Sequence, residues 1–153
     1  MSIQFKSIVG LQSQSYFNFL SANGTARETP IHAASWLNVQ EKWEIINYND
    51  LSSTGKLCYG DVVGFRNPHF NVYLSGFPGY SAVTTMGKLQ DAERLVLLDP
   101  QDPSSTAEMT VEDEFYLQQV NISKYAKVNG NGIQISVPLT TNAEATFRII
   151  VTI

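Results

Sequence analysis

Hydrophobic and polar positions alternate in short runs along most of the chain, and a period of two residues predicts β-strands. The clearest stretch is 59–76, YGDVVGFRNPHFNVYLSG, in which apolar residues at 62–65 are followed by a polar segment at 66–69. A second apolar run follows at 72–74. A strand, a tight polar turn and a second strand predict a β-hairpin.

The same hairpin pattern occurs three times. Its anchors are apolar pairs nine positions apart: Leu11 with Leu20, Phe65 with Leu74, and Leu117 with Ala126. The second members of these pairs follow one another at intervals of 54 and 52 residues. An independent anchor, Trp43, Leu95 and Phe147, repeats at intervals of 52 residues. A unit of this length that occurs three times predicts a threefold internal repeat.

We therefore expect one domain of 153 residues with repeats at approximately 1–52, 53–104 and 105–153. Each repeat has four predicted strands, about twelve in all, and closing them into a barrel removes exposed sheet edges. Residues 89–98 contain good helix formers and are also compatible with an amphipathic helix. The equivalent segments of the other repeats are rich in β-formers, so a strand at 94–98 is favoured.

The three hairpins ending FLSA, YLSG and YAKV, and the apolar closing segment of each repeat, resemble the β-trefoil proteins. The stretch 59–76 is similar to hairpins of the fascin, agglutinin and MIR-type trefoils, and TFRIIVTI at the C-terminus resembles the last strand of fascin-like trefoils. The resemblance implies an all-β fold, a β-trefoil. The Gln-x-Trp of ricin-type sugar sites is replaced once by Gln40-Glu41-Lys42-Trp43, which is one residue longer.

Composition excludes several classes of partner. The net charge is −4, the lysines and arginines are scattered singly, and no basic face for nucleic acid is predicted. No apolar run reaches the length of about 18 residues that membrane insertion requires. The single cysteine, Cys58, cannot form an intramolecular disulfide, and no signal peptide is seen, so a cytoplasmic location is expected. Export by an unconventional route is the alternative to this location.

No catalytic constellation is predicted. Residues 79–83, GYSAV, lack the last glycine of the Gly-x-Ser-x-Gly elbow. Two distant histidines and one cysteine give no metal-ligand spacing. The acidic run Glu112-Asp113-Glu114 is interpreted as solvated charge at a strand entrance. We expect a protein that is not an enzyme and needs no cofactor.

Ligand binding is therefore the expected kind of function, and the polar groups of the hairpin are of the kinds that bind sugars. A flat aromatic ring stacks on the C–H face of a sugar, while amides, carboxylates and guanidinium groups bind its hydroxyls. The densest set of such groups lies in the second repeat. Trp43 aligns with Leu95 and is expected in the core, whereas Trp36 lies near a predicted loop and is a candidate for stacking on a sugar. The candidate ligand contacts are therefore Arg66, Asn67, His69, Asn71, Tyr80 and Trp36.

The expected function is that of a lectin that recognises terminal sugars of glycans or glycoproteins through one to three shallow sites. A homodimer is compatible with this function, because several weak sites add avidity. One alternative is a protease inhibitor that inserts the loop at 98–106 or the loop at 23–30. A second alternative is an actin- or cytoskeleton-binding trefoil of the fascin or hisactophilin kind.

Overall fold

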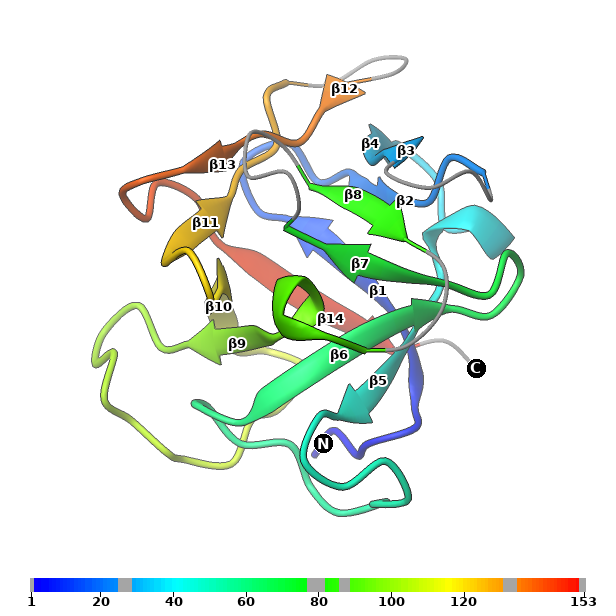
Figure 1. The fold of residues 1–153 in the computed structure, drawn as a ribbon. Coiled ribbons are helices and arrows are strands. Elements are labelled where there is room, and N and C mark those ends of the chain that lie inside the picture. Colours follow the sequence, from blue (N-terminus) through cyan, green and yellow to red (C-terminus); the bar gives the residue numbers. More distant parts are fainter. Residues whose placement is uncertain (1, 25–28, 77–81, 86–88, 131–134, 152–153) are drawn as a thin grey trace.

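The computed structural model describes residues 2–24, 29–76, 82–85, 89–130 and 135–151 (Figure 1). The first repeat comprises β1 (Ile8–Ser13), β2 (Phe19–Ser21), β3 (Thr29–Pro30), β4 (His32–Ala34), the 3-10 turn η1 (Val39–Glu41) and β5 (Trp43–Asn47). The second comprises β6 (Val62–Asn67), β7 (Val72–Ser75), β8 (Val83–Thr85), the 3-10 turn η2 (Asp91–Glu93) and β9 (Leu95–Leu98). The third comprises β10 (Glu114–Gln119), β11 (Lys124–Ala126), β12 (Ile135–Ser136), β13 (Leu139–Thr140) and β14 (Phe147–Val151).

The first and last strands of each repeat form a closed antiparallel barrel. In order around the barrel, β1 pairs with β5, β5 with β6, β6 with β9, β9 with β10, β10 with β14, and β14 with β1. Closure leaves these strands without an exposed edge. The all-β prediction and the closed barrel are confirmed.

Three hairpins cap one end of this barrel. The inner strands of the repeats pair as β2 with β4, β7 with β8, and β11 with β13. The cap is joined across its centre, since the backbone N–H of Ile31 donates to the carbonyl of Ala82 at 2.9 Å. The N–H of Ala82 in turn donates to the carbonyl of Val137 at 2.8 Å. Each repeat therefore contributes one residue to a central junction.

The backbone repeats the same unusual conformation in each hairpin turn. Phe17, Asn71 and Ser123 all have left-handed φ angles, 57°, 54° and 51° respectively. These residues are separated by 54 and 52 positions, the spacing of the sequence repeat. Left-handed backbone is uncommon outside glycine, so the shared angles show that the three turns are built alike.

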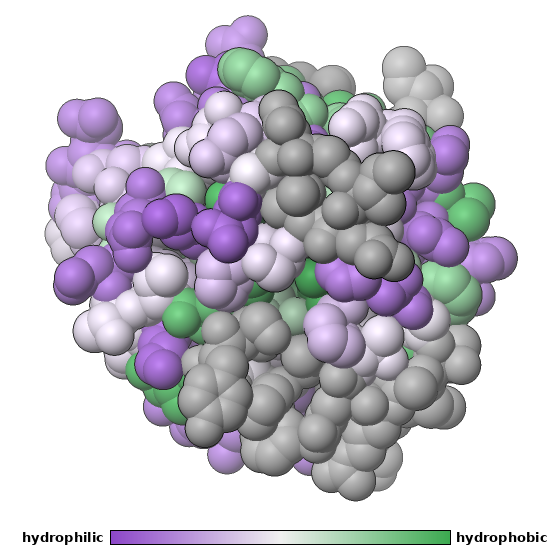
Figure 2. All heavy atoms as spheres, turned by 90° about the horizontal axis from the view of Figure 1, so that it is seen from above, coloured by the Kyte–Doolittle hydropathy of each residue, from purple (hydrophilic) through white to green (hydrophobic). Residues whose placement is uncertain are grey.

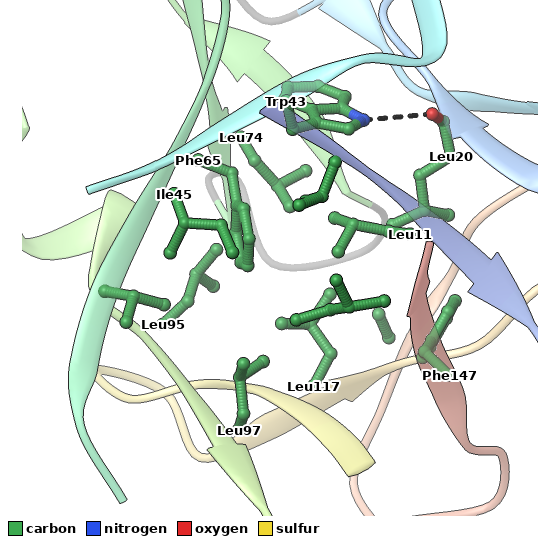
Figure 3. Close-up of a cluster of buried hydrophobic side chains, with 14 of the residues drawn as sticks. Leu11, Leu20, Trp43, Ile45, Phe65, Leu74, Leu95, Leu97, Leu117 and Phe147 are labelled. Carbon is green, nitrogen blue, oxygen red and sulfur yellow. Dashed lines mark hydrogen bonds between the residues drawn. The ribbon is translucent and has the colours of Figure 1, made fainter. Parts of the chain in front are cut away.

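The core is formed by inward-facing residues of the barrel strands (Figure 3). Trp43, Phe65, Phe115 and Phe147 are among its largest fully buried side chains. The indole N–H of Trp43 donates to the carbonyl of Leu20 at 3.0 Å, which satisfies its polar group within the apolar interior. The prediction that Trp43 belongs to the core is confirmed.

Buried serine–glutamate pairs hold the two 3-10 turns against the cap. The hydroxyl of Ser21 donates to Glu41 at 2.5 Å, and that of Ser75 donates to Glu93 at 2.8 Å. The other oxygen of each carboxylate accepts the backbone N–H of the residue before the turn, at 2.9 and 3.0 Å. Both glutamates are buried, and their carboxylates can be buried because each oxygen accepts a hydrogen bond.

The segment 89–98 contains both elements that its sequence allows. Its helix formers make the single 3-10 turn η2, and β9 follows at Leu95–Leu98, so the favoured strand is confirmed. β9 pairs with β10 over four residues, and this pairing outweighs the local helix propensity. Within the described part of the chain, no helix is long and apolar enough to cross a membrane.

Candidate functional site

The hairpin of the second repeat differs in one respect from the prediction. Strand β6 extends to Asn67, so Arg66 and Asn67 belong to the strand and not to the turn. Successive side chains of a strand point to opposite faces. Arg66 therefore faces outward, whereas Asn67 faces inward and is 0% exposed. The prediction that Asn67 contacts ligand is wrong.

Asn67 positions the loop beside the hairpin. Its amide nitrogen lies 3.1 Å from each of three carbonyl oxygens, those of Val39, Gln40 and Lys42. Its amide oxygen accepts the N–H of Phe70 at 2.9 Å. The side chain thus ties the turn of the second repeat to η1 of the first.

The structure brings Arg66 and Asn71 together. The Nη1 of Arg66 donates to the Oδ1 of Asn71 at 3.0 Å, and its Nε donates to a carboxylate oxygen of Glu44 at 3.0 Å. His69 is exposed on the same turn, and its ring packs edge-on against Phe70 with centroids 4.7 Å apart. Arg66 thereby joins Glu44 of one repeat to Asn71 of the next.

The two remaining predicted residues lie apart from this group. Trp36 follows β4, precedes η1 and is 57% exposed, so its ring is accessible, but it does not line the cavity described next. Tyr80 lies outside the described residues. Ligand contact by Trp36, His69 and Tyr80 stays a prediction.

An open hollow of about 700 Å³ is lined by residues of β5 and β7 and of the segments beside them. Strand β6 lies between these two strands, since it pairs with β5 on one side and with β7 on the other. We call it the β5–β7 hollow. Its described lining residues are Lys6, Glu44, Ile46, Tyr48, Leu51, Tyr73 and Leu89. The hollow lies where the first repeat meets the second.

Strand register explains why these side chains meet. Glu44 pairs with Arg66 across β5 and β6, and Arg66 pairs with Tyr73 across β6 and β7, so the three form one outward-facing row. In a parallel row, Ile46 pairs with Gly64. Because Gly64 has no side chain, another residue can pack directly on the backbone of β6 at this point.

Leu89 occupies the space above Gly64. A Cβ atom added to Gly64 would lie only 2.4 Å from a methyl group of Leu89, so the leucine packs directly on the backbone of β6. Together with Ile46, it gives the hollow an apolar floor. A glycine inside a strand marks a close approach of another group, and here that group is Leu89.

Tyr48 is a further lining residue of the hollow. Its backbone N–H donates to the carbonyl of Val62 at 3.0 Å, which continues the β5–β6 pairing past the end of β5. The guanidinium carbon of Arg94 lies 5.5 Å from the centroid of the Tyr48 ring. A cation–π contact of this kind fixes the orientation of the ring.

These lining residues of the hollow were not identified from the sequence as candidate ligand contacts: Lys6, Glu44, Tyr48, Tyr73 and Leu89. The outward orientation of Tyr73 was predictable, because the alternation of inward and outward side chains in the hairpin places it on the same face as Arg66. The pairing of Glu44 with Arg66 is a contact between repeats, and it follows only from the register of β5 on β6.

The equivalent positions in the other repeats carry different residues. Between the second and third repeats, Val96 stands in place of Glu44 and Gln118 in place of Arg66. Tyr116 stands in place of Gly64, and its ring packs edge-on against Tyr125 with centroids 6.2 Å apart. The glycine and the Glu–Arg pair of the β5–β7 hollow are therefore both absent from the described residues of this junction.

Between the third and first repeats, the barrel pairing brings Arg148 opposite Gln12. Arg148 also lies 3.7 Å from the carboxylate of Glu114. Gly10 takes the place of Gly64, and Leu37 packs over it, as Leu89 does over Gly64. Phe19, which pairs with Gln12, takes the place of Tyr73. The apolar cover and the aromatic residue are thus present at both junctions, whereas the Glu44–Arg66 pair is replaced by Arg148 and Gln12.

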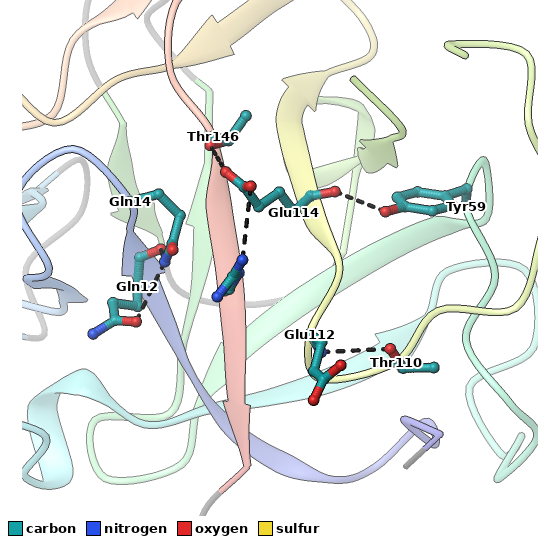
Figure 4. A network of polar contacts seen from close by, with 8 residues as sticks. Gln12, Gln14, Tyr59, Thr110, Glu112, Glu114 and Thr146 are labelled. Carbon is teal, nitrogen blue, oxygen red and sulfur yellow. Dashed lines mark hydrogen bonds and ion pairs between the residues drawn. The ribbon is translucent and has the colours of Figure 1, made fainter. Parts of the chain in front are cut away.

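The predicted acidic run has structural partners (Figure 4). Asp113 accepts the N–H of Thr110 at 2.8 Å, and Glu114 accepts the hydroxyl of Thr146 at 2.6 Å. The hydroxyl of Tyr59 donates to the carbonyl of Glu114 at 2.7 Å. Burial, and then the carboxylates of Asp113, Asp99 and Glu114, raise the pKa of Tyr59 from 10.0 to about 12.

Hydrophilic residues cover much of the described surface on the face that carries β4, β8 and β12, and hydrophobic residues form separate spots there (Figure 2). Among the residues that the structure describes, no group of three or more His, Cys, Asp or Glu side chains is arranged to hold a metal ion.

Comparisons with known proteins define the fold. No protein-family model matches the chain, and a search of curated proteins found none similar to it in sequence. Solved structures are similar in three dimensions. The SDF2-like protein from Arabidopsis thaliana is 11% identical, with a TM-score of 0.80 over 97% of this chain and 94% of that one.

Two further structures agree. A Caenorhabditis elegans protein of unknown function is 10% identical, with a TM-score of 0.77 over 99% of this chain and 97% of that one. The designed threefold-symmetric protein ThreeFoil is 10% identical, with a TM-score of 0.68 over 95% of this chain and 99% of that one. The chain has the β-trefoil fold, as its hairpins and barrel indicate.

Proposed function

We propose that this protein is a non-catalytic carbohydrate-binding protein, a lectin, that takes a terminal sugar of a glycan or glycoprotein into the β5–β7 hollow. The observation that carries the proposal is the composition of the hollow. Tyr48 and Tyr73 stand beside the Glu44–Arg66 pair over an apolar floor. Flat rings next to fixed polar groups are what a sugar requires, since each pyranose has an apolar C–H face and a rim of hydroxyls.

The polar groups are positioned for hydroxyls. Glu44 uses one carboxylate oxygen to accept from Arg66 at 3.0 Å, and a carboxylate has about four acceptor positions, so it retains capacity for a sugar hydroxyl. Asn71 borders the same row through its hydrogen bond to Arg66. Because these groups already hold one another, little side-chain entropy is lost when the ligand binds.

A glycan array with the Tyr73→Ala variant tests the proposal. We expect the native protein to bind a set of glycans that share a terminal sugar. The variant should lose about tenfold or more in affinity for them, equivalent to about 1.4 kcal/mol, because the stacking ring is gone.

Tyr125→Ala is the matched control, since Tyr125 occupies the equivalent position of the third repeat and packs on Tyr116. We expect this control to bind the same glycans as the native protein. Equal binding by all three proteins, or an array without any bound glycan, contradicts the proposal.

The inhibitor alternative is less compatible with the loop at 98–106. The backbone N–H of Asp102 donates to the carbonyl of Asp99 at 3.2 Å, and that of Ser105 donates to the carbonyl of Asp102 at 2.9 Å. These consecutive turns fold the loop back on itself, whereas insertion into a protease cleft favours an extended segment. Protease inhibition that is unaffected by sugar would favour this alternative.

A further inference from the structure

We infer that the sugar bound in the β5–β7 hollow is acidic, with a carboxylate that is received by Lys6. This inference rests on the proposed function, because it names the class of sugar for the same site. It is carried by three features of Lys6: its backbone conformation, its place in the lining of the hollow, and the charges around it.

Lys6 has a left-handed backbone, with a φ of 71°. Its equivalent in the second repeat is Gly60, with a φ of 83°. The two residues make the same barrel contact, since the N–H of Lys6 donates to the carbonyl of Ile45 and the N–H of Gly60 to that of Leu97. Glycine adopts this backbone without steric cost, whereas lysine does not. A strained non-glycine residue is a pointer to function when its side chain reaches a binding site.

Lys6 is one of the residues that line the hollow, together with Glu44 and Tyr73. Across the described residues, the ammonium group of Lys6 has no ion pair or hydrogen-bond acceptor. Glu44, the carboxylate in the same lining, is held by Arg66 at 3.0 Å. A cation at the rim of an aromatic cavity, with the nearest lining carboxylate already paired, is available to an anionic ligand group.

The charge around the hollow is opposite to that of the whole chain. Among the described residues, three cations, Lys6, Arg66 and Arg94, line the hollow or contact its lining residues, and Glu44 is a carboxylate of the same lining. Asp50 lies in the loop that follows Tyr48 and adds a second carboxylate, which leaves three cations against two carboxylates and a net excess of one positive charge. In a protein of net charge −4, this local excess of positive charge favours anionic over neutral sugars.

The hollow thus offers one group for each part of an acidic sugar. Tyr73 and Tyr48 are placed for the C–H faces, Glu44 for a hydroxyl, and Lys6 for the carboxylate. A plain carboxylate such as acetate would use only Lys6 and leave the aromatic rings unoccupied. We therefore expect recognition of a uronic or similar acidic sugar and no measurable competition by acetate.

Matched pairs of methyl glycosides test the inference by titration calorimetry. Methyl glucuronide is compared with methyl glucoside, and methyl galacturonide with methyl galactoside, because the members of each pair differ only at C6. For at least one pair, we expect the uronide to bind about fivefold more tightly than its neutral partner, which is the strength of one partly exposed ion pair. Raising the ionic strength from about 0.01 M to about 0.5 M should remove most of this preference.

Three variants locate the preference. Lys6→Met and Lys6→Gly should abolish the preference for the uronide, and Lys6→Gly should unfold at a temperature no lower than that of the native protein. Lys6→Arg should keep the preference. Lys56→Met is the control, since Lys56 lies 3.7 Å from Glu108 and does not line the hollow.

The possible outcomes separate the two proposals. Equal binding of uronide and neutral glycoside, with binding that depends on Tyr73, overturns the inference and leaves the proposed function standing. A preference that survives in Lys6→Met also overturns it. Binding of neither member of either pair, together with an empty glycan array, contradicts the proposed function itself.

Discussion

At the scale of single residues, neighbours in the sequence take opposite roles because a strand exposes every second side chain. Arg66 joins Glu44 to Asn71 on the outer face, while Asn67 fixes three backbone carbonyls on the inner face. Both residues are polar and adjacent, so composition alone does not distinguish a ligand contact from a positioning residue. The distinction follows from where the strand ends.

Replacing Asn67 tests its positioning role. Asn67→Ala removes the donor to three carbonyls of the η1 loop and should lower the free energy of unfolding by about 2 kcal/mol, as expected for a buried hydrogen-bonding group. Chemical denaturation measures this change. Gln119→Ala should lose a similar amount, because Gln119 donates to the carbonyl of Asp91 at 2.9 Å in the equivalent place. A change below about 0.5 kcal/mol in Asn67→Ala contradicts the assignment.

The raised pKa of Tyr59 predicts that the free energy of unfolding decreases at alkaline pH. Burial, with the neighbouring carboxylates, raises its pKa to about 12, whereas an unfolded tyrosine ionises near pH 10. The folded state therefore retains the phenol proton more strongly. The associated stability is complete below about pH 10 and is lost as the pH rises toward 12.

Tyr59→Phe isolates this effect. The variant loses the hydrogen bond to the carbonyl of Glu114 and should be less stable than the native protein by about 1 kcal/mol at neutral pH. Between pH 10 and 12 the difference should narrow, because only the native protein has this phenol to ionise. Denaturation curves across that range measure it, and a difference that stays constant with pH contradicts the assigned pKa.

At the scale of elements, the repeat and its hairpins were predictable from hydrophobic spacing, because each apolar pair marks a strand that must face the core. The β5–β7 hollow was not predictable in the same way. It is made by Glu44 from the first repeat and Tyr73 from the second, and their proximity depends on how β5, β6 and β7 align.

Gly64 offers a test of the hollow as an element of the sheet. A methyl group at this position would lie 2.4 Å from Leu89, so Gly64→Ala should displace Leu89 into the hollow and weaken sugar binding about tenfold. Gly10→Ala is the matched control, because the same change there displaces Leu37 on another face. The sugar affinity of this control should not change. Equal losses in both variants, measured by calorimetry, contradict the role of the hollow.

At the scale of the whole molecule, the backbone is close to threefold symmetric while the surface is not. The hairpin turns share their left-handed residues, yet the position of Gly64 holds Tyr116 in the third repeat. The shared backbone is required for barrel closure, whereas the outward-facing residues are free to differ. We therefore expect one sugar site of this kind per chain, so that cross-linking of cells requires an oligomer.

A titration of the isotopically labelled protein with its best array ligand, followed by amide NMR shifts, tests the central claim most directly. The account predicts saturation at one ligand per chain, with the largest shifts at Glu44, Tyr48, Arg66 and Tyr73. Saturation at three ligands, or shifts centred on Val96, Gln118 and Tyr125, would contradict it.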